Sequence, residues 1–180
     1  MKNVKNFSLA IAMLIYFLSF GQEINEKTKF KEYEFFILNK EYENYDDVIK
    51  SNGFIKVSDT SFTLSNSDYR LTQIRKKSKT IILFSKINLK YESDKVNESF
   101  TLLDTLHINY LDDNNFVTIG YCELDGLIPE QIISLVKKSK KRYLEMIIKS
   151  WKVNEKTMKI EKIIDVSKMK CINEHFEYSE

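Results

Sequence analysis

The chain has 180 residues, with 28 Lys+Arg against 26 Asp+Glu and a formal net charge of +2. Hydrophobic residues make up 43% and aromatic residues 13%, which excludes a disordered chain, and four Gly with one Pro exclude collagen-like or low-complexity sequence. Two cysteines exclude a disulfide-dense miniprotein, and the near-zero charge gives no reason to expect a polyanionic partner. The length suits one domain with a substantial core.

The first 21 residues predict a secretory signal peptide. Two lysines precede an apolar stretch of 14 residues at 7–20, and the small residues Ser19 and Gly21 predict cleavage before Gln22. A helix needs about 20 apolar residues to cross a bilayer, so this stretch is too short for a span. We therefore expect an exported protein, periplasmic or secreted, with no stable membrane span after cleavage of residues 1–21. An uncleaved anchor is the alternative.

Removal of the signal peptide changes the charge balance. Residues 22–180 hold 26 basic and 26 acidic residues, but these are segregated: the excess is +7 in 70–90, −8 in 91–136 and +8 in 137–170. We expect the oppositely charged blocks to pair in the fold. If the two basic blocks share a face, they instead form a basic patch that binds an anionic surface or an acidic glycan. No nucleic-acid site is expected, because the protein is exported and no aromatic residue interrupts the basic run at 75–79.

In chain order, the first half predicts one short helix followed by strands. Positions 27–43 fit helical and strand periods alike, and we favour a helix for their first half. Residues 44–51 predict a helix, with Asp46 and Asp47 near its positive end and Asn52-Gly53 as its stop. Alternating or β-branched runs then predict strands at 54–57, 62–64, 69–74 and 80–91, with a polar turn at 76–79.

The middle of the chain predicts a β-hairpin. Residues 103–111 and 116–124 have strand character and flank Asp112-Asp113-Asn114-Asn115, residues that tolerate left-handed turn conformations. The same four residues suggest a calcium loop, but an EF-hand needs an oxygen ligand at its fifth position, which is Phe116 here. We therefore predict a turn.

The C-terminal part predicts helix packed on this sheet. Pro129 suits a first helical position, and apolar residues then recur at spacings of 4, 7, 4 and 4: Ile132, Val136, Tyr143, Ile147 and Trp151. The polar run 137–142 predicts a break near Ser139 into two helices, and 158–166 returns to strand character. The predicted fold class is α+β: one domain over 22–180, an antiparallel sheet with a C-terminal helix or helix pair on one face.

The two cysteines predict a disulfide. Cys122 and Cys171 belong to an exported chain, and closing their loop of about 50 residues contributes about 4 kcal/mol in the chain-entropy model. The bond would fasten the C-terminal tail to the sheet. Two alternatives stay open: two buried free thiols, or a reactive thiol with His107 or His175 as its base.

Motifs for catalysis, cofactors and metals are missing from the sequence. No phosphate loop, dinucleotide fingerprint, nucleophile elbow or zincin helix occurs, and His107 and His175 lack ligands at metal-binding spacing. We therefore predict no catalytic, cofactor-binding or metal site. The favoured function is non-catalytic binding of an unknown protein or envelope glycan. The alternatives are an envelope hydrolase that uses acids of 91–136, or an inhibitor or immunity-type protein.

The last third of the chain carries a set of short motifs that occurs together in other proteins. They are Gly120-Tyr121-Cys122, Asp125-Gly126, Pro129-Glu130-Gln131-Ile132-Ile133, Leu135-Val136-Lys137, Ile148-Lys149-Ser150-Trp151-Lys152-Val153-Asn154, Lys156-Thr157-Met158-Lys159-Ile160 and Cys171-Ile172-Asn173-Glu174. Residues 120–174 thereby resemble the C-terminal part of a group of small exported bacterial proteins with no known activity. The resemblance implies two paired cysteines and a secreted context, but no site. Ser150 and Met158 stand where the pattern has Ala and Gly.

Overall fold

The computed structural model describes residues 36–92, 95–109 and 111–176, and the account below concerns the unit Ile37–Glu180. The signal peptide at 1–21 and the helix favoured for the first half of 27–43 lie outside the described residues. Where the chain is described, its structure is mostly antiparallel β-sheet with one short helix, α2 (Tyr45–Ser51). None of the described segments forms a helix with the length and apolarity needed to cross a membrane.

The strands form three antiparallel sheets. Sheet A has the order β1 (Glu41–Tyr42), β5 (Lys95–Asn109), β4 (Lys79–Glu92), β3 (Ser67–Lys76), β2 (Ile55–Leu64). Sheet B has the order β11 (Lys159–Ile163), β10 (Ile147–Asn154), β8 (Ile132–Lys137), β6 (Asn115–Ile119). Sheet C has the order β7 (Cys122–Glu123), β12 (Lys170–Ile172), β9 (Tyr143–Leu144).

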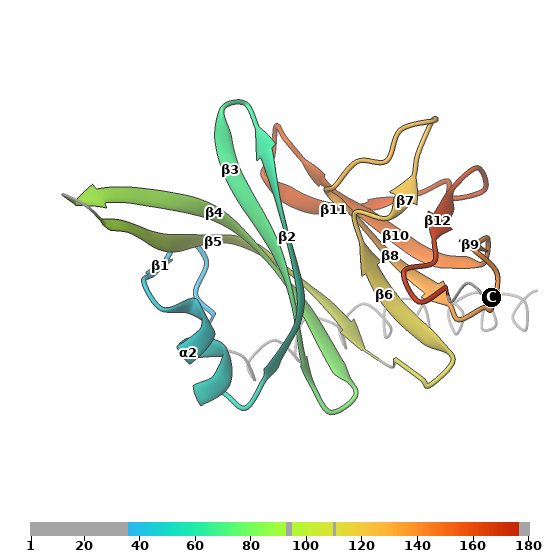
Figure 1. Cartoon of the computed structure of the whole chain (residues 1–180), viewed down its shortest axis with the longest axis horizontal. Coiled ribbons are helices and arrows are strands. Elements are labelled where there is room, and N and C mark those ends of the chain that lie inside the picture. The colour runs from blue at the N-terminus through green and yellow to red at the C-terminus, as the bar shows by residue number, and fades with distance from the viewer. Residues whose placement is uncertain (1–35, 93–94, 110, 177–180) are drawn as a thin grey trace, which may run out of the picture. The chain divides into compact units, whose positions relative to one another are not determined.

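Sheet B is the middle layer of the unit. One of its faces packs against sheet A in a core that includes Leu71, Phe84 and Ile133. Its other face packs against sheet C in a second core that includes Ile132 and the two cysteines. The three sheets follow one another across Figure 1, from sheet A on the left to β7, β12 and β9 on the right.

The predicted α+β class with a C-terminal helix is wrong, because residues 129–151 form β8, β9 and much of β10. In β8, Ile132 and Val136 face sheet C, whereas Ile133 and Leu135 belong to the core shared with sheet A. A strand buried on both faces has a continuous apolar run without alternation, and such a run cannot be told from a buried helix by its period. The tertiary environment therefore decided between the two.

The predicted hairpin around Asp112 is also wrong, although its turn is present. The Asn114 amide donates to Asp112 Oδ1 at 2.9 Å, as in a turn. The flanking strands β5 and β6, however, pair with different neighbours and belong to sheets A and B. The segment between them is the connection from one sheet to the other.

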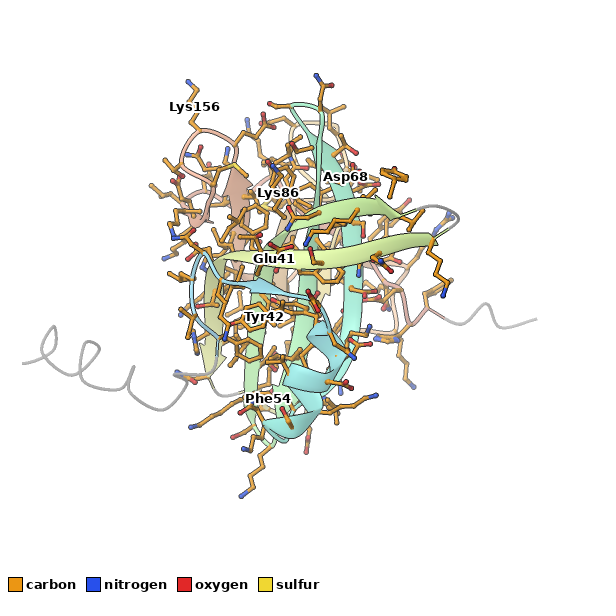
Figure 2. All side chains as sticks on the ribbon, turned by 90° about the vertical axis from the view of Figure 1, so that its left-hand side faces the viewer. Glu41, Tyr42, Phe54, Asp68, Lys86 and Lys156 are labelled. Atoms are coloured by element: carbon orange, nitrogen blue, oxygen red, sulfur yellow. A yellow bond between two sulfur atoms is a disulfide. The ribbon has the colours of Figure 1, made fainter. Side chains whose placement is uncertain are left out.

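The short helix was predicted correctly, and it lies on the outer face of sheet A (Figure 2). Asn44 is its N-cap and accepts from the Asp47 amide, and the chain leaves the helix through Gly53 at φ +71°. The ring of Tyr45 stacks on Phe100 at 5.3 Å between centroids, and its hydroxyl lies 2.9 Å from Ser85 Oγ. Helix α2 thus covers the face of sheet A that is turned away from sheet B.

A buried pair of hydroxyls in sheet B leads to a first prediction. Ser134 and Ser150 lie opposite each other in β8 and β10, are fully buried, and share a hydrogen bond of 2.7 Å. We expect Ser150→Ala to lower the free energy of unfolding by about 1–2 kcal/mol, because it leaves a buried hydroxyl with one fewer partner. Removing both hydroxyls, in Ser134→Ala with Ser150→Ala, should restore most of that loss. Urea denaturation measures both, and a double variant as unstable as the sum of the singles would contradict the prediction.

Candidate functional site

A hollow of about 410 Å3 opens where β8 ends and β9 and β10 begin. We call it the lysine hollow, and it is lined by Lys137, Lys138, Ser139, Lys141, Tyr143, Glu145 and Met146. Glu145 is the only carboxylate in this lining, and its Oε2 lies 3.4 Å from the Nζ of Lys141. The lining therefore carries an excess of positive charge.

The loop that forms the hollow follows from the local sequence. The run 137–142 contains no apolar residue, so β8 cannot continue into either core beyond Val136. The loop is held at its start by two backbone hydrogen bonds, from the Lys137 amide to the Met146 carbonyl and from the Lys138 amide to the Asn114 carbonyl. Five basic side chains thus occupy six consecutive positions, where their like charges repel one another.

Asn173 holds this loop in place from a distant part of the chain. Its Nδ2 donates to the carbonyls of Ser139 and Lys141, both at 2.9 Å, and its backbone amide donates to the Arg142 carbonyl at 2.9 Å. Asn173 is only 6% exposed, so these hydrogen bonds are shielded from water. One buried asparagine therefore fixes three backbone carbonyls of a strongly cationic loop.

The disulfide fixes the strand that precedes Asn173. Cys122 and Cys171 lie directly opposite each other in β7 and β12, both fully buried, and their sulfurs are bonded. This confirms the predicted pairing and overturns both alternatives, free buried thiols and a reactive thiol. Two residues beyond Cys171 the chain reaches Asn173, so the disulfide links the C-terminal segment to the lysine hollow.

The two histidines that were considered as bases lie in separate surroundings. The ring of His175 meets Phe116 edge-on at 5.2 Å between centroids, and the His107 Nε2 lies 3.4 Å from Thr105 Oγ1 in sheet A. Burial, with a smaller contribution from the charge of Lys79, lowers the pKa of His107.

The lowered pKa of His107 predicts a pH dependence of stability. The unfolded chain takes up a proton on this ring near pH 6.5 while the folded protein resists it, so the free energy of unfolding falls as the pH drops below about 6.5. Urea denaturation across this pH window should show a shallower fall for His107→Gln than for the wild type. In the control Tyr91→Thr, an exposed position of sheet A, His107 is intact and the wild-type slope is retained. Equal slopes in all three proteins would contradict the prediction.

Oppositely charged blocks pair with each other, as expected from their segregation. Arg70 lies 3.6 Å from Glu98, and Lys90 lies 3.5 Å from Glu41. These pairs join the block 70–90 to acidic segments of sheet A. The block 137–170 is joined to the block 91–136 by two further ion pairs, Lys159 with Asp104 at 3.6 Å and Lys170 with Glu123 at 3.1 Å.

The two basic blocks do not build one common hollow. The lysine hollow takes all its cations from 137–170. Arg70, from the other block, lines a polar cleft of about 270 Å3 between α2 and sheet A, and its guanidinium lies over the ring of Phe100 at 4.7 Å. Both cations of that cleft, Arg70 and Lys56, already pair with carboxylates of its own lining. The charged side chains of this cleft are therefore used within the protein, where they join α2 and sheet A.

Three of the acids proposed for hydrolysis, Asp104, Glu123 and Glu98, lie in different parts of the described structure. Asp104 accepts the Ile160 amide at 2.8 Å between sheets A and B, whereas Glu123 lies in sheet C and Glu98 in the polar cleft. Hydrogen bonds lower the pKa of Glu41, from Ser99 first, and of Glu161, from Asn154 first. No group of three or more His, Cys, Asp or Glu in the described part of the chain is arranged to hold a metal ion.

No family model, curated protein or solved structure matches the chain. The resemblance of residues 120–174 to small exported bacterial proteins therefore stays a prediction. The candidate site is supported only by the geometry of this chain. Sequence reasoning named the basic block 137–170 but missed the hollow and the role of Asn173. The signal for both was local: a run of five cations in six residues, and an asparagine two positions after a disulfide cysteine.

Proposed function

We propose that this protein is an exported, non-catalytic binding domain of the cell envelope, and that its lysine hollow binds an anionic group of its partner. One observation carries the proposal: Asn173 holds the carbonyls of a loop with five cations in six residues, and only one carboxylate lines the resulting hollow. Repulsion among these cations destabilises the free protein, and a bound anion relieves it.

The disulfide supports export as part of the same proposal. Disulfides persist in oxidising compartments, and the Cys122–Cys171 bond is fully buried in the core between sheets B and C. The signal peptide predicted at 1–21 would deliver the chain to such a compartment.

The test is a titration of the exported protein with a short-chain polyphosphate, followed by calorimetry. We expect saturable binding that weakens as the salt concentration rises, because the lysines of the hollow are exposed to solvent. The variant with Lys137→Ala, Lys138→Ala and Lys141→Ala should bind at least about ten-fold more weakly. Intact mass of the same preparation should show that it begins at Gln22.

A matched control removes the same charge elsewhere. Lys149→Ala, Lys156→Ala and Lys162→Ala change three exposed lysines of sheet B and its β10–β11 turn, none of which lines the hollow. This control should bind polyphosphate nearly as well as the wild type. The proposal fails if the two triple variants bind equally well, or if the wild type does not bind.

A further inference from the structure

The outer face of sheet C continues the lysine hollow as a ridge of exposed apolar side chains. Ile172 in β12 lies opposite Tyr143 in β9, and its amide donates to the carbonyl of Tyr121 on the other side at 2.8 Å. Tyr121, Ile172 and Tyr143 are 43%, 37% and 42% exposed. We call them the tyrosine row. Because neighbouring strands are about 4.8 Å apart, the two tyrosine backbones are separated by about 10 Å.

Cations flank this row. The guanidinium of Arg142 and the Nζ of Lys170 each lie 5.7 Å from the centre of the Tyr143 ring. Tyr143 also lines the lysine hollow, so the hollow and the row share a residue. A track of cationic side chains thus runs from Lys137 and Lys138 past Tyr143 to Lys170, which also pairs with the carboxylate of Glu123 at 3.1 Å.

The position of the track follows from the buried side of the same strands. Cys122, Leu144 and Cys171 point inward and are fully buried against sheet B, so the alternate residues of these short strands must point outward. The disulfide core therefore fixes the inner face of sheet C. The alternation of side chains along the same strands then determines which residues face outward.

A ligand for this surface must be anionic, extended and partly apolar. A single phosphate would occupy part of the hollow but would make no use of the tyrosine row. A linear chain of sugar rings with carboxylates satisfies both parts, since the C–H faces of the rings pack on Tyr and Ile side chains while the carboxylates meet the Lys and Arg groups. Single-stranded nucleic acid fits less well, because bases need successive aromatic platforms and the middle residue of the row, Ile172, is aliphatic.

We infer that the partner bound at the lysine hollow is a linear acidic polysaccharide, which lies across the tyrosine row from the hollow to Lys170. This inference rests on the proposed function, because it names the ligand class for the same site. It adds two positions to that site, Tyr121 and Ile172, which contribute contact with the sugar rings and no charge.

The experiment compares ligands that share charge but differ in their backbone. The exported protein is titrated with a short oligogalacturonate, a polyphosphate with the same number of charges, a neutral oligosaccharide and an oligothymidylate. We expect the oligogalacturonate to bind about ten-fold more tightly than polyphosphate. The Tyr121→Thr, Ile172→Thr variant, whose two positions do not line the hollow, should lose this advantage and keep its affinity for polyphosphate.

The matched control is Tyr91→Thr, which changes a tyrosine of β4 in sheet A that is 75% exposed and lies outside the row. It should bind both anions as the wild type does. Equal wild-type affinity for polyphosphate and oligogalacturonate, or unchanged oligogalacturonate affinity in the double variant, overturns the acidic polysaccharide while leaving the proposed function standing. Tighter binding of oligothymidylate overturns it in favour of nucleic acid. If neither polyphosphate nor oligogalacturonate binds, the proposed function itself fails.

Discussion

Replacing both cysteines, in Cys122→Ala with Cys171→Ala, is expected to lower the free energy of unfolding by about 2–5 kcal/mol. The bond closes a loop with a sequence separation of 49, and the chain-entropy model assigns about 4 kcal/mol to such a closure. Both residues are fully buried, so the substitution also removes contacts in the core shared with Ile132 and Leu144. Urea denaturation measures the loss.

Reductant supplies the control for this prediction. The wild type should lose stability in the presence of a strong reductant, whereas the double alanine variant, which has no disulfide, should be insensitive to it. The structure further predicts faster hydrogen exchange at 139–142 in the variant, because β12 carries the chain to Asn173. An unfolding midpoint unchanged by either treatment would show that the bond contributes nothing to stability.

The second large effect is expected at Asn173. Asn173→Ala removes three side-chain hydrogen bonds, two donated to the carbonyls of Ser139 and Lys141 and one accepted from the His175 amide, at a cost of about 1–3 kcal/mol. The loop 138–142 should then exchange its amide hydrogens faster, and the affinity for polyphosphate should fall about ten-fold, because binding must now order the loop. Hydrogen exchange with mass spectrometry and calorimetry measure these two consequences.

Asn154→Ala is the matched control for Asn173→Ala. The Asn154 side chain also makes several hydrogen bonds, to Glu161 and to the amides of Lys156 and Thr157, but it belongs to the β10–β11 turn. This variant should lose stability without changing exchange at 139–142 or the affinity for polyphosphate. If Asn173→Ala left the exchange of that loop unchanged, its role in positioning the lysines would be refuted.

Local features of the chain were predicted well where the deciding interactions are close in sequence. Helix α2 has its cap, acidic first turn and stop within ten residues, and it was found as predicted. The strand runs at 69–74 and 80–91 form β3 and β4, joined by the predicted polar turn. The long β5 was predicted only in its second half, and residues 95–98 at its start are exposed and lack an apolar pattern.

Features that depend on which layers meet could not be predicted in this way. The run Ile132-Ile133-Ser134-Leu135-Val136 fits a buried helix or a buried strand equally, and the cover of sheets A and C on both its sides makes it a strand. The separation of β5 and β6 into two sheets likewise has no local signal. A turn between two strands allows a hairpin or a crossing between layers, and only packing distinguishes them.

The sequence by itself determined the charge segregation and the short helix, because each depends on composition or on near neighbours, and it favoured the pairing of Cys122 with Cys171 over free thiols. Only the tertiary structure decided where the charges meet: it pairs Lys159 and Lys170 with acids of the block 91–136, yet gathers Lys137, Lys138 and Lys141 at one hollow. The physical reason is Asn173, whose buried hydrogen bonds join a loop and a tail more than thirty residues apart. Long-range contacts of this kind leave no periodic trace in the sequence.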